Sequence, residues 1–282
     1  MRWAVTGAGG MLGTEVAALL ADRPGDGVLA LARPDLDVTD AAAVGRALAG
    51  VDAVVHCAAW TAVDDAEHDE AAAHAVNAVG TANVAAACAA TGARLVHVST
   101  DYVFGGDRPG AWPEDAPAAP RSAYGRTKLA AEVAVRQALP EHWILRTAWL
   151  YGAHGPNFVR TMTARALAGT PSTVVDDQHG QPTWAADLAR RAVEVVDHDV
   201  PHGTYHATSS GSTTWCGLAR EVYRLAGADP RLVTPMPSTQ LDRPAPRPAN
   251  SVLGHDGWTA AGLPPLPPWQ DSLRTAWPQI RG

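Results

Sequence analysis

The sequence is poor in lysine: Lys128 is the only one, and arginine supplies every other basic side chain. Cysteine is also scarce, because Cys57, Cys88 and Cys216 are an odd number at unrelated spacings, with no Cys-x-x-Cys pair. This pattern favours buried free thiols over disulfides or a zinc site. Positive charge is in deficit too. A net charge of −7 and a pI near 5.8 argue against a surface for nucleic acid or anionic membrane.

Long hydrophobic runs are missing as well. The chain has no run of about 18 apolar residues and no basic segment followed by an apolar one, so we expect a soluble, cytoplasmic protein. None of the eleven histidines occurs in His-x-x-x-His or His-Glu-x-x-His spacing, which leaves a metal hydrolase without support. His56, on an apolar run, is interpreted as a core histidine, and we assign no metal-binding residues.

What the sequence does have is an alternation of apolar runs and alanine-rich stretches over residues 1–150. This alternation is typical of βαβ units and predicts an α/β fold with a Rossmann-type, doubly wound parallel sheet that binds a dinucleotide. The 46% apolar content suffices for its core. We expect strands at 3–7, 28–32, 52–59, 94–99 and 143–148, and helices at 11–22, 40–49, 69–90 and 123–138.

After residue 150 glycine and proline become frequent, and segment 229–250 contains six prolines. We interpret residues 151–282 mainly as a smaller substrate-binding region at the carboxyl ends of the strands, where such sheets bind ligands. Residues 185–209 are expected to return to the main sheet. The composition predicts helices at 157–168, 185–197 and 214–226, and a strand at 203–209.

A glycine-rich loop, TGAGGMLG, follows the first expected strand. Gly7, Gly10 and Gly13 are spaced by three, with Met11 and Leu12 between the last two. Glycines at such a strand-to-helix turn let the backbone approach a pyrophosphate, and the helix N-terminus offers free N–H groups. An ordinary glycine-rich turn is the alternative, but the position between strand and helix favours dinucleotide binding.

The end of the second strand bears on the choice of dinucleotide. An NAD site usually has an acidic residue there, whereas this chain has Arg33, whose planar guanidinium suits the 2′-phosphate of NADP. Asp35 or Asp37 could instead reach a ribose hydroxyl. We therefore predict NADPH, with NADH as the alternative, and include Arg33 and Asp37 among the cofactor-binding residues.

Tyr124 and Lys128 are four residues apart and lie on one face of the helix expected at 123–138. A nearby ammonium group favours the phenolate, so we expect Lys128 to lower the pKa of Tyr124 toward the working range. A lysine can also hold a cofactor ribose hydroxyl, a role that the broader arginine fits less well. An exposed helix pair without a catalytic role is the alternative.

The fourth strand ends in STDYVFGG, which places Ser99, Thr100 and Asp101 at the ligand-facing edge of the sheet. A hydroxyl there can donate to a carbonyl oxygen and stabilise the charge that develops during reduction. We choose Thr100 for this role, place Asp101 at the substrate and assign Ser99 to the cofactor. Capping of the strand end is the alternative for the two hydroxyls.

Together these motifs resemble the extended short-chain dehydrogenase/reductase superfamily and, within it, the dTDP-4-dehydrorhamnose reductase family. The resemblance covers essentially the whole chain and rests on motifs that occur in the family's order: DAVVHCAAWTAVDDAE (52–67), VSTDYVFGG, YGRTKLAAE, RTAWLYG (146–152), DQHGQPTWAADLA (177–189), GTYHATSSGSTTW (203–215) and RPANSVL (247–253).

The resemblance implies roles for individual residues. It implies Thr100, Tyr124 and Lys128 as the catalytic set. It places Tyr102 and Trp149 at the sugar, although core packing is the alternative for Trp149. Contacts to substrate or nucleotide would come from Arg247 with segment 250–253, and a cofactor-side loop from Ala58, Ala59 and Thr61. Some members dimerise through magnesium-bound glutamates. Glu15 stands at such a place but has no matching C-terminal partner, so a homodimer and Mg²⁺ stay open.

The implied activity is NADPH-dependent reduction of the C4 keto group of a dTDP-4-keto-6-deoxyhexose, with dTDP-4-dehydro-L-rhamnose as the expected substrate and dTDP-L-rhamnose as the product. Reduction of another dTDP-deoxysugar and a non-catalytic NADP-binding regulatory subunit are the alternatives. Dehydratases of the superfamily have an acid–glutamate pair at this strand, whereas here Tyr102 follows Asp101, which disfavours elimination. An epimerase is not excluded by these residues, but the C-terminal motifs match the reductases.

Overall fold

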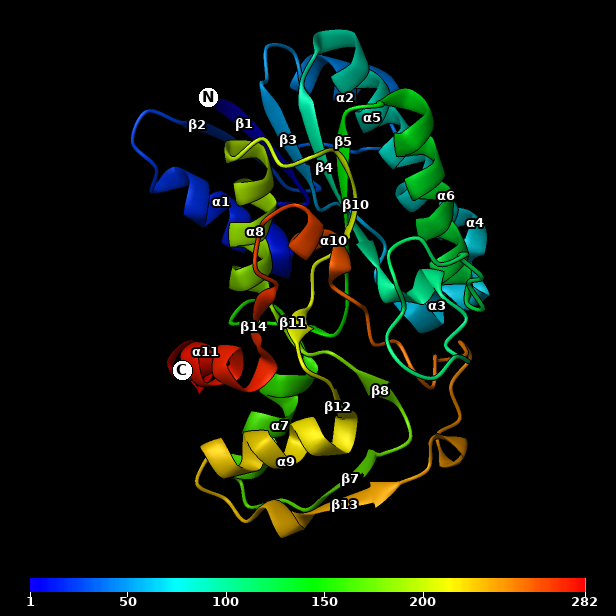
Figure 1. Cartoon of the computed structure of the whole chain (residues 1–282), viewed down its shortest axis with the longest axis vertical. Helices are drawn as coiled ribbons and strands as arrows, with labels where there is room; N and C mark the ends of the chain where they lie inside the picture. The colour runs from blue at the N-terminus through cyan, green and yellow to red at the C-terminus, as the bar shows by residue number, and fades with distance from the viewer. Residues whose placement is uncertain (282) are drawn as a thin grey trace.

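The computed structural model describes residues 1–281 and contains one central parallel sheet of six strands (Figure 1). The spatial order is β10-β5-β4-β3-β1-β2, and all neighbours are parallel. This is the predicted α/β, Rossmann-type architecture. The strands are β1 (Arg2–Thr6), β2 (Gly27–Leu31), β3 (Ala53–His56), β4 (Arg94–Thr100), β5 (His142–Thr147) and β10 (Gly203–His206).

Helices cover both faces of this sheet. On one face α1 (Met11–Ala21) packs against α8 (Ala185–Asp197), and on the other α5 (Gly80–Thr91) lies between α2 (Ala41–Ala47) and α6 (Ala123–Ala138) (Figure 1). Each face has its own apolar core, because the strands are buried on both sides and present aliphatic side chains to both layers. Helix α6 begins where Ser122 Oγ accepts a hydrogen bond from Gly125 N at 3.1 Å.

The long helix predicted at 69–90 is interrupted. It consists of α4 (Glu70–His74), a π-helical turn (Ala75–Val79) and α5, and a short helix, α3 (Val63–His68), precedes it. The π turn carries Asn77, which is fully buried, accepts from Trp60 N at 2.7 Å and donates to Thr127 Oγ1 at 2.9 Å. The interruption thus ties the loop after β3 to α6, a tertiary requirement that helical composition does not reveal.

The lower part of the molecule in Figure 1 is built around a separate apolar cluster. Its helices are α7 (Phe158–Leu167), α9 (Trp215–Leu225) and α11 (Trp269–Arg281). The short helix α10 (Asp256–Ala260) instead packs on β10 and adds Trp258 to the core of the main sheet. Short strand pairs accompany them: β7 (Ser172–Val175) with β13 (Val233–Met236), β6 (Leu150–Tyr151) with β9 (Thr183–Trp184), β8 (His179–Gly180) with β12 (Thr213–Thr214), and β11 (Ser209–Ser210) with β14 (Leu266–Pro268). Single 3₁₀ turns occur at Asp101–Val103, Pro230–Leu232 and Ser238–Gln240.

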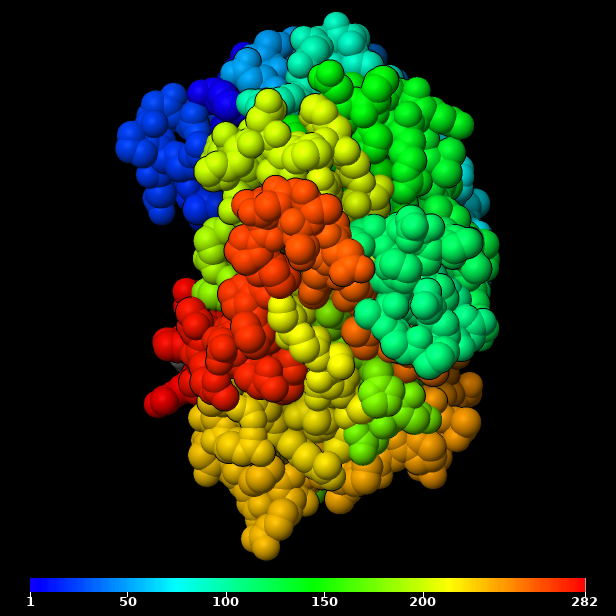
Figure 2. All heavy atoms as spheres, viewed as in Figure 1, coloured from blue at the N-terminus to red at the C-terminus, as the bar shows by residue number. Residues whose placement is uncertain are grey.

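The chain crosses between the two parts several times. Residues 185–206 return to the main sheet as α8 and β10, and β10 pairs with β5. Figure 2 shows that the C-terminal residues, orange to red, lie across the front of the molecule over the junction of its upper and lower parts. No helix among residues 1–281 combines the length and the apolar character that crossing a bilayer requires.

Candidate active site

The glycine-rich loop packs so tightly that side chains are excluded. Gly7 has φ +68°, and a Cβ there would lie 2.6 Å from Ala58 N. A Cβ on Gly13 would overlap the Gly7 carbonyl oxygen, and Gly10 is the N-cap of α1 without a side-chain cap. Among the other loop residues, Met11 is partly exposed and Leu12 packs in the core. The loop therefore leaves the first N–H groups of α1 without side-chain partners, which suits an anionic ligand.

The loop after β3 lies against these glycines. Ala58 N donates to Thr6 Oγ1 at 3.4 Å, and Ala58 is the residue that a side chain on Gly7 would strike. Ala58 and Ala59 are partly exposed, and Thr61 is exposed. Small residues here allow two backbones to approach each other and a ligand, as expected for a cofactor-side loop.

The charged side chains that follow β2 differ in their hydrogen bonding. Asp35 accepts a hydrogen bond from Ala32 N at 3.0 Å, and Asp37 accepts from both the backbone and the hydroxyl of Thr39. Arg33 is exposed and forms no hydrogen bond or ion pair with any residue of the described range 1–281. Asp37, predicted to bind the cofactor, is thus already engaged in its own turn, while the Arg33 guanidinium is free to meet a phosphate.

Thr100 ends β4, and its hydroxyl is already hydrogen-bonded. Its Oγ1 accepts from Tyr102 N at 3.2 Å and donates to Asp101 Oδ1 at 3.0 Å. Asp101 is 2% exposed, and burial raises the pKa of its carboxyl to about 6, although hydrogen bonds from Ser251 and Thr100 oppose the rise. A ligand carbonyl that accepts the Thr100 proton must therefore compete with Asp101.

Tyr124, in the first turn of α6, lies beside the end of β4. Its ring meets that of Tyr102 edge to face, with centroids 5.6 Å apart. Burial raises the pKa of the Tyr124 phenol above its usual value, a hydrogen bond with the Thr100 side chain lowers it in part, and Asp101 raises it further. The expectation that Lys128 lowers this pKa is wrong in this structure, because burial dominates and the ammonium is bound elsewhere. The phenol is therefore protonated at neutral pH, the form that a proton donor needs.

Lys128 points into the sheet, beneath the predicted catalytic hydroxyls. It is 3% exposed, and its Nζ donates to Val98 O at 2.7 Å and lies 3.5 Å from His97 Nε2. Burial lowers the pKa of Lys128 to about 8, while Glu132 and Cys57 raise it. Lysine and tyrosine share a helix face as predicted, but the ammonium is held by β4.

Ser99 does not reach the ligand edge of the sheet. The sequence predicts that it contacts the cofactor, yet it is 3% exposed and its hydroxyl donates to Glu132 Oε1 at 2.7 Å. Since successive residues of a strand point to opposite faces, Ser99 faces α6 rather than the ligand edge. Its side chain belongs to a buried ionic cluster that the motif pattern did not indicate.

Trp149 is held in an unusual conformation. Its φ is +47°, a left-handed value that bulky residues rarely adopt, and its indole stacks on that of Trp215 with centroids 3.6 Å apart. A Cβ on Gly180 would lie 2.6 Å from two atoms of the Trp149 ring. Trp149 follows β5 by two residues and is partly exposed, so it can offer a flat apolar wall at the edge that holds Thr100. Sequence reasoning missed Trp215 as its partner.

Arg247 comes to the site from the C-terminal region. It forms a two-pronged ion pair with Asp64 at the start of α3, with Nη2 2.8 Å from Oδ2, and this pairing is the main cause that lowers the pKa of Asp64. Ala245 N also donates to Asp64 at 3.2 Å. The predicted contact residue is therefore present beside Tyr102, but its charge is already balanced by a carboxylate.

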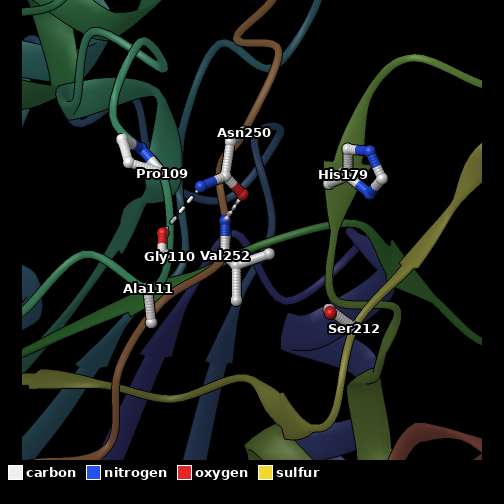
Figure 3. A pocket seen from close by; sticks show the side chains of 7 residues that line it. All are labelled: Pro109, Gly110, Ala111, His179, Ser212, Asn250 and Val252. Carbon is white, nitrogen blue, oxygen red and sulfur yellow. Dashed lines mark hydrogen bonds between the residues drawn. The ribbon is translucent and has the colours of Figure 1, made fainter.

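A pocket of about 470 Å³ lies where the loop after β4 faces segment 250–252 (Figure 3). On one side of it Asn250 Nδ2 donates to Gly110 O, and His179 and Ser212 stand on the opposite side. None of Thr100, Tyr124 or Lys128 lines this pocket, so it does not contain the predicted catalytic residues.

His56 is buried on β3, and its ring nitrogens lie 2.6 Å from Thr6 Oγ1 and 3.0 Å from Thr81 Oγ1, so it is the predicted core histidine. Within residues 1–281, no cluster of three His, Cys, Asp or Glu side chains is placed to hold a metal ion. Glu15 lies 3.8 Å from His154 Nε2.

The whole described chain matches one protein family. The family described as "RmlD substrate binding domain" matches residues 1–281. A "probable dTDP-4,6-dihydroxy-2-methyloxan-3-one 4-ketoreductase" of Streptomyces antibioticus is 53% identical, covering 99% of this chain and 96% of the relative. A dTDP-4-dehydrorhamnose reductase of Streptomyces griseus is 52% identical over 100% of this chain and 94% of the relative.

The solved structures agree. A dTDP-4-dehydrorhamnose reductase from Bacillus anthracis in complex with NADP superposes with a TM-score of 0.93 at 34% identity, covering 99% of both chains. The fold and these relatives define an oxidoreductase of the Rossmann-fold reductase class. The chain belongs to the RmlD substrate-binding family, that of the dTDP-4-dehydrorhamnose reductases.

Proposed function

We propose that this protein reduces the C4 keto group of a dTDP-4-keto-6-deoxyhexose with NADPH. The observation that carries the proposal is the convergence of Thr100, at the carboxyl end of β4, with Tyr124, whose ring packs on that of the neighbouring Tyr102. The Lys128 ammonium is held beneath them by Val98 O. Two hydroxyl donors at one point, one of them a protonated phenol, suit a carbonyl oxygen that gains negative charge.

The residues present fit a dinucleotide phosphate. The Gly7–Gly13 turn and the N-terminus of α1 would hold the pyrophosphate, and Arg33 would meet the 2′-phosphate of NADP. The family resemblance implies that Lys128 holds the nicotinamide ribose, a contact for which its ammonium would have to turn from Val98 O. When bound, NADPH supplies the hydride that adds to C4. The NADP complex of the Bacillus anthracis relative supports this cofactor.

Side chains of the protein then supply the proton and stabilise the negative charge on the C4 oxygen. Tyr124 donates its phenolic proton to the C4 oxygen, so that one hydride and one proton convert the ketone to an alcohol. Thr100 donates a hydrogen bond to the same oxygen in competition with Asp101. Trp149 and Tyr102 would border the sugar, and Arg247 with segment 250–253 would contact the nucleotide part of the substrate.

Within this class we take dTDP-4-dehydro-L-rhamnose as the substrate and dTDP-L-rhamnose as the product, supported by the name of the Streptomyces griseus relative. A second candidate is the 4-keto group of another dTDP-deoxysugar. The Streptomyces antibioticus relative, named as such a 4-ketoreductase, is similar to the same degree and favours it.

The test follows the near-ultraviolet absorbance of NADPH with purified protein, alone and with dTDP-4-keto-6-deoxy-L-lyxo-hexulose. Oxidation that requires the sugar supports the proposal. A higher kcat/KM with this sugar than with other dTDP-4-keto sugars favours the first candidate, and the reverse favours the second. Tight NADPH binding without oxidation of any dTDP-keto sugar would contradict it and favour a regulatory subunit.

A further inference from the structure

A buried ionic cluster joins α6 to two strands of the sheet. Its centre is Glu132, which is fully buried. Its Oε1 accepts from Ser99 Oγ on β4 at 2.7 Å and from Arg146 Nε on β5 at 2.9 Å. Its Oε2 accepts from Arg146 Nη2 at 2.8 Å and from Arg136 Nη2 at 2.7 Å. One carboxylate thus bonds a helix and two strands at once.

This cluster lies one layer beneath the predicted catalytic residues. Tyr124, Lys128 and Glu132 are spaced by four and share one face of α6. Ser99 directly precedes Thr100, and the register pairs Ser99 with Arg146 and Thr100 with Thr147. The position of Thr100 relative to the helix that carries the other two residues therefore depends on bonds made by Glu132.

Glu132 also provides charge. Lys128 is buried among groups from three elements: His97 on β4, Cys57 after β3, and Glu132 on its own helix, with His56 stacked on His97. Glu132 in turn faces Arg146, Arg136, His142 and His206. Burial raises the pKa of the Glu132 carboxyl, but hydrogen bonds from Arg146 and Ser99 and the arginine charges outweigh it, so the net shift is downward and the group is ionised.

We propose that Glu132 is a positioning residue of this enzyme: its carboxylate clamps α6 to the ends of β4 and β5 and places a negative charge one helical turn from Lys128. The inference rests on the proposed function for the roles of Thr100, Tyr124 and Lys128. Glu132 itself is buried and touches no reacting atom, so it acts through these three.

Two substitutions separate the charge from the clamp. Glu132→Gln keeps the shape of the side chain but removes the negative charge that raises the pKa of Lys128, so this pKa should fall. In E132Q/R146Q one positive and one negative charge are removed together, and the two amides can still hydrogen-bond, so that pKa should return toward the wild-type value.

The chain itself allows a direct measurement, because Lys128 is its only lysine. Lysine labelled with ¹³C at the ε position gives one side-chain resonance, whose titration reports this single group. In the wild type, Lys128 should titrate with a pKa of about 8. In E132Q this pKa should be at least about one pH unit lower, and in E132Q/R146Q it should be close to the wild-type value. Glu141→Gln, an exposed carboxylate of the same chemistry, is the matched control.

A folded E132Q protein whose lysine titrates like wild type would overturn the charge part of the proposal. The titration needs no substrate, so its failure is distinguishable from failure of the proposed function. In the active enzyme, the alkaline limb of the pH profile of kcat/KM should follow the resonance in each variant, a shift that loss of packing alone would not produce.

Ser99→Ala tests the clamp even if E132Q does not fold. It removes one hydrogen bond between Glu132 and β4 and keeps every charge. We expect kcat to fall about tenfold with the affinity for NADPH and the lysine titration unchanged, since a small misplacement of Thr100 costs catalysis rather than binding. An S99A variant with wild-type kcat would overturn the clamp.

Discussion

The indole of Trp149 stacks on that of Trp215 at 3.6 Å and nearly parallel, with an interplanar angle of 9°. Trp215 belongs to α9 and Trp149 to the segment after β5, so this contact joins the two parts of the molecule at the edge of the sheet that holds Thr100. The left-handed backbone of Trp149 costs on the order of 1 kcal/mol or more and persists because Trp215 and Gly180 fix the ring.

Gly180→Ala should displace this ring, because the new Cβ would lie 2.6 Å from indole atoms of Trp149. If Trp149 borders the sugar, KM for the dTDP-keto sugar should rise about tenfold while NADPH binding is unchanged. Gly45→Ala, in α2 with nothing within 4 Å of the new Cβ, is the control. The measurement is steady-state kinetics with the dTDP-keto sugar. A wild-type KM and kcat in G180A would contradict a contact between Trp149 and the sugar.

Tyr124→Phe removes the predicted proton donor and keeps the ring. We expect kcat to fall at least about a hundredfold, the usual scale of general acid catalysis, with NADPH affinity within about twofold of wild type. Tyr205→Phe is the matched control, since the Tyr205 hydroxyl donates to Pro201 O at 2.6 Å, away from the site. Near-wild-type turnover by Y124F would assign the proton to another group.

Asp101→Asn should stabilise the protein at neutral pH. The folded-state pKa is about 6 against 3.8 for the ordinary group. The folded state therefore binds more protons between these values, and stability falls as pH rises through that window. The ionised carboxylate costs on the order of 3 kcal/mol at pH 7.

The measurement for Asp101→Asn is guanidinium unfolding of both proteins at about pH 7 and about pH 4.5. The D101N advantage should be present at the higher pH and shrink at the lower one, where the native carboxyl is protonated. The exposed Asp115→Asn serves as control. An advantage of equal size at both values would mean that Asp101 is not the titrating group.

Arg33→Ala tests the choice of cofactor. Because the guanidinium has no partner within residues 1–281, its removal should weaken NADPH binding about tenfold or more and leave NADH binding unchanged. The exposed Arg46→Ala on α2 is the matched control. Fluorescence titration with both cofactors gives the ratio, and equal losses for NADPH and NADH would argue against a 2′-phosphate contact.

Local patterns in the sequence determined much of this protein. The alternation of apolar runs and helical stretches sets the parallel sheet, because burial on both faces demands continuous apolar strands. The glycines at 7 and 13 fix the turn predicted to hold the cofactor, since no side chain fits at these two positions. The spacing of Tyr124 and Lys128 places them on one helix face, because that periodicity is a property of the helix itself.

Only the tertiary structure decided where the polar groups of these residues are bound. Lys128 turns to Val98 O, Ser99 to Glu132, and Arg247 to Asp64, a partner 183 positions away in the chain. The π turn that buries Asn77 and the stacking of Trp149 on Trp215 likewise join distant segments. Such pairings depend on which elements pack together, and the energy of a buried polar group depends on that packing rather than on its neighbours in sequence.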